Sequence, residues 1–271
     1  MSLTISALNV YPVKSLGGFS LQQCRLEFTG LAFDRRWMVV RPDGKMLTQR
    51  SHPQMALVGT SMENDNLVLD CFGMDSHTVP PTDAAMTRIS SEVWGDEVPG
   101  IDLGDETALW LSQAIGDRCR LIAFPASEER QCDPAVSLPG DHTLYADGFP
   151  LLIVSQSSLD GLNGKLEAPV SMSRFRPNIV VDGADPHAED RWKAVQIGEI
   201  GLRLVQACAR CSVPTVDPDA GVLAGPEPIH TLSSYRERDG EIYFGVNATP
   251  DSEGLLSVGD AITIVASAHE H

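Results

Sequence analysis

Two cysteines separated by two residues, Cys208 and Cys211, are the side chains in this sequence best suited to chemistry. They end the apolar segment IGLRLVQAC and open a loop with two prolines, and Arg210 stands beside Cys211. A neighbouring cation favours the thiolate, which is the form that binds soft metals and exchanges disulfides. A structural zinc site needs about four ligands, and the sequence has no second pair of this kind. The pair therefore predicts either a soft-metal ligand or a thiol redox site.

Two motifs place basic residues where we expect strands to begin or end. YPVKSL puts Lys14 and Ser15 after a proline, and an ammonium beside a hydroxyl can hold a phosphate. FDRRWMVV is expected to form a strand in which Arg35 and Arg36 point to opposite faces, so only one of them can reach a given pocket. The alternatives are a solvated lysine and an exposed pair on the sheet surface.

A third basic motif, SRFRPNIVV, is expected to enter a buried strand. Arg174 and Arg176 would share one face of that strand, and Pro177 prevents a helix from continuing through them. Two such arginines suit a bidentate anion or a heteroaromatic ligand, and salt bridges to the many acidic residues are the alternative.

Charge is distributed unevenly along the chain. The formal net charge of the 271 residues is -17, yet residues 1–50 hold seven basic against three acidic side chains, a net of +4, so the remainder carries -21. The acidic balance argues against nucleic-acid polymers and anionic membranes as partners, because both bind basic surfaces. The basic segment is either a solvated face or a pocket for a small anion such as a phosphate ester.

Targeting and redox signals point to the cytoplasm. The longest apolar run, FPLLIV, is far shorter than the roughly 20 residues of a membrane helix, and the first residues lack the basic and apolar pattern of a signal peptide. Four of the six cysteines are scattered singly, which is typical of reduced thiols. We therefore expect a cytoplasmic protein without a membrane partner.

Strands are expected far more often than helices. Helices are predicted to begin near Asp105 in DETALWLSQAIG and after Ser155 in SQSSLDGLNGKL, where acidic or hydroxyl residues favour a helix start. The pattern predicts an α+β, mainly β fold with two β-barrel-like domains, residues 1–120 and 121–271, and a few packing helices. The boundary is expected between residues 115 and 140. Turn residues separate the predicted strand segments LTISALNVYPV, RRWMVVRPDGKMLTQR, LVGTSMENDNLVLDC, PNIVVDG, IGLRLVQAC and AITIVAS.

Five motifs spread over the whole chain resemble those of one protein family. VYPVKS, DRRW, YADGFP, FRPN and ARCSVPTVDPDAG occur in this order. They are similar to the motifs of MOSC proteins with an N-terminal MOSC β-barrel domain, a group that includes the mitochondrial amidoxime-reducing component and bacterial reductases of N-hydroxylated bases. The resemblance implies a molybdenum cofactor, a pyranopterin whose dithiolene gives molybdenum two sulfurs and whose phosphate needs a basic cradle.

The resemblance also implies roles for individual residues. Cys211 matches the cysteine that binds molybdenum as a third sulfur, and Asp147 matches an aspartate near the metal, a candidate carrier of protons. The implied cofactor-binding residues are Lys14, Ser15, Arg35, Arg176, Asn178 and Arg210.

The implied activity is reduction of the N–O bond of small N-hydroxylated substrates. This reaction consumes two electrons and two protons, which a metal that changes its oxidation state can deliver and no side chain can. The sequence contains neither a G-x-G-x-x-G dinucleotide motif nor a C-x4-C-x2-C run. We therefore expect a separate electron donor, a flavin protein with a haem or iron–sulfur carrier, or an iron–sulfur domain outside these residues.

Two other classes of function stay open. A non-catalytic molybdenum-cofactor-binding or sulfur-carrier module would use the same pocket and the same Cys211 without turning over a substrate. A thiol redox protein that uses Cys208 and Cys211 would bind no metal.

Overall fold

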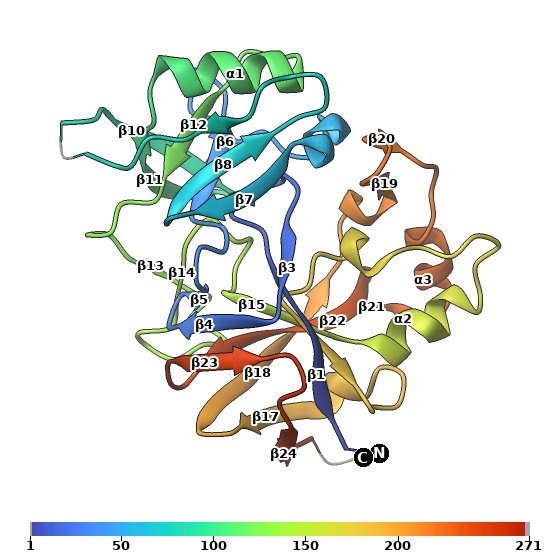
Figure 1. Cartoon of the computed structure of the whole chain (residues 1–271). Helices are drawn as coiled ribbons and strands as arrows, with labels where there is room; N and C mark the ends of the chain where they lie inside the picture. Colours follow the sequence, from blue (N-terminus) through green and yellow to red (C-terminus); the bar gives the residue numbers. More distant parts are fainter. Residues whose placement is uncertain (1, 84, 269–271) are drawn as a thin grey trace.

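Strands outnumber helices in the computed structural model, which describes residues 2–83 and 85–268 (Figure 1). This confirms the mainly β, α+β fold class. Both predicted helices are confirmed as α1 (Asp105–Ile115) and α2 (Gln156–Asn163), and the Ser155 hydroxyl caps α2 by accepting from the Ser158 backbone N–H at 3.2 Å. The sequence analysis missed α3 (Ile229–Arg236). Within the described ranges, no helix is long and apolar enough to cross a bilayer.

The largest sheet draws on both ends of the chain and has nine strands in the described residues. Backbone hydrogen bonds also join residues 3–5 to residues 259–262, so the sheet curls back toward its own first edge. Its path is β24 (Ile262–Ser267), β17 (Trp192–Ile197), β18 (Ile200–Ala209), β22 (Glu241–Pro250), β15 (Leu151–Ser155), β16 (Ile179–Asp182), β1 (Thr4–Val10) and β3 (Phe19–Leu21), with β21 (Glu237–Arg238) beside β22.

A second sheet of five strands lies under α1 in the other lobe (Figure 1). Its order is β10 (Arg88–Val93), β11 (Asp96–Asp102), β12 (Arg120–Ala123), β6 (Trp37–Val40) and β2 (Val13–Lys14). The smaller sheets are β23 (Gly254–Ser257) with β4 (Gln23–Glu27) and β5 (Gly30–Leu31), β7 (Gly59–Glu63) with β8 (Asn66–Asp70) and β9 (His77–Thr78), β13 (Arg130–Gln131) with β14 (His142–Thr143), and β19 (Val216–Asp217) with β20 (Val222–Leu223).

Each large sheet has its own apolar core. One core lies on the nine-stranded sheet and includes Leu8, Ile179 and Leu202. The other lies between the five-stranded sheet and α1 and includes Leu111 and Leu121. The division of the chain into residues 1–120 and 121–271 stays a prediction, and β1 pairs with β16 in the sheet formed mainly by later residues.

The first strand links the two sheets. After β1 the chain passes Tyr11 and Pro12 and continues as β2, which pairs in parallel with β6 of the five-stranded sheet. Lys14 and Ser15 therefore lie at the point where the chain leaves one sheet for the other, and Ser15 adopts a left-handed φ of 69°.

Two strand predictions were wrong in detail. Arg35 and Arg36 precede β6, and Arg35 has a left-handed φ of 46° because the turn from Leu31 to Asp34 delays the strand until Trp37. The chain likewise forms a 3-10 helix (Met172–Arg174) before Arg176, whose φ is 55°, so Arg174 and Arg176 do not share a strand face. The other 3-10 helices are Pro53–Leu57, Ala188–Arg191 and Val213–Thr215.

Candidate functional site

A cavity of about 290 Å³ lies where the ends of β2 and β18 meet the beginnings of β15 and β16. The structure brings every site residue predicted from the sequence to this cavity, although they are up to 197 positions apart in the chain. The residues are Lys14, Ser15, Arg35, Asp147, Arg176, Asn178, Arg210 and Cys211. Their chemical roles remain predictions.

Lys14 and Asp147 form an ion pair in the cavity wall. Lys14 Nζ is almost fully buried and donates to Asp147 Oδ1 at 2.5 Å and to the Tyr145 carbonyl at 2.8 Å. Burial lowers the pKa of Lys14, and Asp147 only partly offsets this. Burial alone would raise the pKa of Asp147, but the adjacent Lys14 ammonium and the Trp94 N–H hold it well below its usual range. The Asp147 side chain, 70% exposed into the cavity, is therefore a carboxylate at neutral pH.

Two arginines lie over one buried tyrosine beside this pair. The guanidinium carbons of Arg35 and Arg176 stand 4.6 and 4.2 Å from the centre of the Tyr11 ring. Arg35 also donates to Asp34 at 2.6 Å and to the Arg176 carbonyl at 3.1 Å. Burial and the nearby Arg35 charge lower the pKa of Arg176 to about 10. The local excess of positive charge favours an anionic ligand.

Asn178 positions the Arg35 side chain through a hydrogen bond. Its Oδ1 accepts from Arg35 Nη1 and from the Leu152 N–H, both at 3.1 Å, and its Nδ2 donates to the Asn9 carbonyl at 3.2 Å. The side chain is 1% exposed. Asn178 thus ties β1, β15 and β16 together at the cavity and leaves little of its amide for a ligand.

Cys208, near the end of β18, and Cys211, just after it, both line the cavity. Arg210 donates to Cys208 Sγ at 3.2 Å and to the Phe175 carbonyl at 2.8 Å. Cys208 is half-buried among apolar side chains, whereas Cys211 is exposed to the cavity at the start of the loop that leads to Val213–Thr215.

The other thiols differ sharply from Cys211. Burial raises the pKa of Cys24 to about 11 and that of Cys132 to about 12, and it also raises the pKa of Cys119. These three thiols are therefore inert structural side chains. Of the two cysteines that line the cavity, Cys208 is partly buried and Cys211 is exposed, so Cys211 is the more accessible sulfur for a soft metal.

Two buried N–H groups at the cavity have no partner in the described part of the chain. They are Arg176 Nη2 and Arg210 Nε, both fully shielded from solvent. Buried donors of this kind are costly unless something accepts from them, so an acceptor-rich anion suits the site. No cluster of three or more His, Cys, Asp or Glu side chains occurs in residues 2–83 and 85–268. A metal at Cys211 would therefore need other donors that arrive with it, which is how a molybdenum dithiolene cofactor binds.

Sequence reasoning missed several cavity residues. Arg36 does not line the cavity; its Nη2 lies 3.6 Å from Glu27 Oε2. This agrees with the prediction that only one arginine of the motif faces the cavity. The missed cavity residues include three that contact the cavity from turns and loops: Gln49, Arg50 and Trp94. Tyr11 of the VYPVKS motif was missed as well; it contacts the cavity arginines Arg35 and Arg176. Only Trp94 had a local signal, a Trp-Gly pair between alternating strand patterns.

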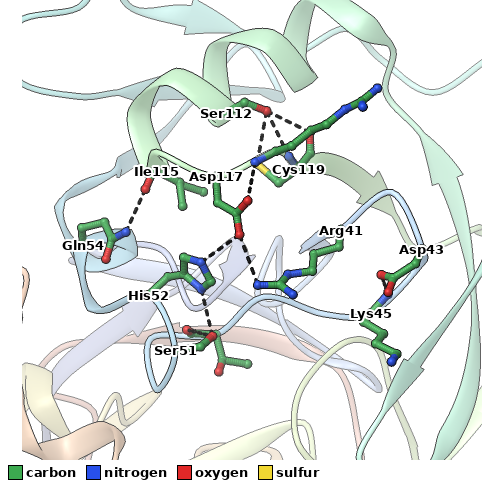
Figure 2. Close-up of polar contacts among 12 residues, drawn as sticks. Arg41, Asp43, Lys45, Ser51, His52, Gln54, Ser112, Ile115, Asp117 and Cys119 are labelled. Carbon is green, nitrogen blue, oxygen red and sulfur yellow. Dashed lines mark hydrogen bonds and ion pairs between the residues drawn. The ribbon is translucent and has the colours of Figure 1, made fainter.

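The residues that follow Gln49 and Arg50 in the chain, His52 and Gln54, are anchored to the end of α1, as Figure 2 shows. His52 Nε2 lies 3.1 Å from Asp117 Oδ2, and Gln54 donates to the Ile115 carbonyl at 2.8 Å. The Arg118 backbone N–H, aided by His52, holds the pKa of Asp117 below its usual range. Gln49 in turn donates to the Ser15 carbonyl at 2.8 Å, so the anchor supports one wall of the cavity.

Family models match both parts of the chain. The MOSC N-terminal beta barrel domain matches residues 2–118 and the MOSC domain matches residues 140–263. The chain belongs to the MOSC family. Similar MOSC proteins include mitochondrial amidoxime-reducing component 1 of Mus musculus, 35% identical over 97% of this chain and 82% of that protein. Component 2 of Bos taurus is 36% identical over 96% and 82%, and component 1 of Homo sapiens is 35% identical over 97% and 83%. Membership of this family confirms the resemblance predicted from the five motifs.

Proposed function

We propose that this MOSC protein is a molybdenum-cofactor-dependent reductase of N-hydroxylated compounds that receives electrons from a separate carrier. The observation that carries the proposal is one cavity in which an accessible Cys211 thiol lies among Lys14, Arg35, Arg176 and Arg210. The names of the similar proteins, amidoxime-reducing components, support the substrate class.

The residues at the cavity fit such a cofactor. Cys211 would supply the protein sulfur to molybdenum, and the unpartnered N–H groups of Arg176 and Arg210 would donate to oxygen atoms of the pterin and phosphate. Lys14 and Ser15, at the crossing between the sheets, would complete the anion site. When bound, the cofactor supplies the two electrons that N–O cleavage requires.

The side chains would bind the substrate and manage its protons. Lys14 Nζ and Trp94 Nε1 both donate to Oδ1 of Asp147, so among the described residues Oδ2 stays available for an N–H of the substrate. Burial lowers the pKa of Lys14, which makes its ammonium a stronger acid than a free lysine. We assign proton delivery toward the departing oxygen to the Lys14 ammonium, which the Asp147 carboxylate holds in position through their hydrogen bond.

The test uses protein made in a host that synthesises the cofactor. Molybdenum and pterin content is measured, and turnover of benzamidoxime is followed with reduced methyl viologen as the donor. We expect about one molybdenum per chain and reduction to benzamidine, with almost no turnover when NADH or NADPH is the only reductant. Bound molybdenum without turnover would favour a non-catalytic carrier, and absence of metal with dithiol exchange would favour a thiol redox protein.

A further inference from the structure

Trp94 occupies a backbone position that normally excludes so large a side chain. Val93 pairs with Asp96, so Trp94 and Gly95 form the two-residue turn of the β10–β11 hairpin, with φ of 54° and 97°. Such turns take Asn, Asp or Gly first, because a bulky residue is strained in the left-handed region. Strain of this kind persists where surrounding contacts hold it, and it is concentrated at ligand sites.

The contacts that hold the indole come from two distant segments. Trp94 Nε1 donates to Asp147 Oδ1 at 2.7 Å, and the Arg50 guanidinium carbon lies 3.9 Å from the ring centre. All three side chains line the cavity, and the indole is still 47% exposed. A hydrophobic core position would bury this ring, so burial does not explain the strained turn.

The arrangement offers two flat, delocalised surfaces beside a carboxylate. Aromatic rings stack favourably on an indole or on a guanidinium plane. Phe149 adds a small apolar surface to the same cavity. Asp147, which is ionised at neutral pH, accepts from the N–H groups of an amidine or amidoxime.

We propose that Arg50 and Trp94 form an aryl-binding subsite, which selects N-hydroxylated substrates whose reacting group is joined to an aromatic ring. The inference rests on the proposed function for its substrates, but its binding test needs no turnover. Trp94 is also a positioning residue for Asp147, through its N–H.

The test compares two amidines that differ only in the ring. Calorimetry measures binding of benzamidine and acetamidine to the cofactor-containing protein. We expect the wild type to prefer benzamidine by about five- to tenfold and the Trp94→Asn variant to prefer it less than about twofold. Asn suits the left-handed turn, so this variant removes the ring at no cost to the hairpin. Trp94→Phe keeps a ring and should keep most of the preference.

Trp110→Phe is the matched control. Trp110 stands on α1, outside the cavity, and its indole N–H donates to the Asp75 carbonyl at 2.7 Å. The preference for benzamidine should therefore not change in this variant. Equal affinities in the wild type, or an undiminished preference in Trp94→Asn, would overturn the subsite. A clear aryl preference in protein that holds no molybdenum or reduces no amidoxime would instead contradict the proposed function and leave the subsite intact.

Discussion

Two regions line the same cavity and are built in opposite ways. The cationic wall, formed by Lys14, Arg35, Arg176 and Arg210, stands at strand ends and donates to main-chain carbonyls in both halves of the chain. The Arg50–Trp94 pair comes from a loop and a hairpin tip and is held by one hydrogen bond and ring contact.

This difference suggests that the cationic wall retains a bound cofactor and that the Arg50–Trp94 pair selects the substrate. The wall is buried, rigidly braced and rich in positive charge, which suits a ligand that stays bound through charge-assisted contacts. The pair is partly exposed and offers flat surface, which suits a ligand that enters and leaves. Changes in the wall should therefore alter cofactor content, and changes in the pair should alter substrate preference.

Removal of the Cys211 thiol should have the largest effect. We expect Cys211→Ala to lose bound molybdenum and to lower amidoxime reduction by roughly 100-fold or more, because Cys211 stands at the ligand position that the family motif implies and is the more exposed of the two cysteines that line the cavity. Cys208→Ala should retain most of both, since Cys208 packs among apolar side chains. Metal analysis and a turnover assay measure the outcome, with circular dichroism as the check on folding. Equal losses in the two variants would point to a dithiol.

A wall arginine should matter more than its near neighbour. Arg176→Gln should weaken cofactor retention about 10- to 150-fold, as expected for loss of a charge-assisted contact of about 1.5 to 3 kcal/mol. Arg174→Gln is the control, because Arg174 binds Asp217 at 3.1 Å and does not line the cavity. Pterin released per chain after dialysis is the measurement. A greater loss in Arg174→Gln would show that the wall is wrongly assigned.

The ion pair between Lys14 and Asp147 should make the free energy of unfolding depend on pH in the acid range. Because the folded pKa of Asp147 is depressed, its stabilising contribution is present above the unfolded pKa near 3.8 and is lost as the pH falls below it. We expect Asp147→Asn to lower the free energy of unfolding by about 1 kcal/mol at pH 7, since solvent screens the exposed carboxylate. Urea titrations of both proteins between about pH 2 and 7 should show a difference that shrinks as the pH falls below 3.8 toward the lower folded pKa. A constant difference at every pH would contradict this ionisation.

The smallest effect is expected at the anchor of the Arg50 segment. His52→Gln should remove part of the contact with Asp117 and cost about 0.5 to 1 kcal/mol, a drop in Tm of a few degrees for a chain of this size. Molybdenum content should stay unchanged, and the preference for benzamidine should fall slightly as Arg50 loosens over Trp94. Calorimetry measures the Tm and the preference for benzamidine, and metal analysis measures the molybdenum content. A loss of cofactor would show that the contact of the anchored segment with Ser15, through Gln49, matters more than its contact with Trp94, through Arg50.

The sequence by itself predicted which residues lie together at the cavity more accurately than it predicted the strands that carry them, and the roles of these residues stay predictions. Residue types such as the Lys-Ser pair at the end of a short strand and the exposed cysteine after β18 are local signals, and all eight predicted residues meet at the cavity. One arginine of the DRRW motif lines the cavity, as predicted, but the predicted reason was wrong, because Arg35 and Arg36 precede the strand and Arg35 lies in a turn.

Only the tertiary structure decided which distant segments complete the cavity. The pairing of β1 with β16 and of β2 with β6, separated by more than a hundred residues in one case, cannot be read from local patterns, because it depends on how two cores pack. Trp94 meets Arg50 and Asp147 for the same reason, and its strained turn is compatible with the fold only because those contacts hold it. The chemistry of a side chain depends on the residue type alone, whereas its neighbours in space depend on how distant segments of the chain pack.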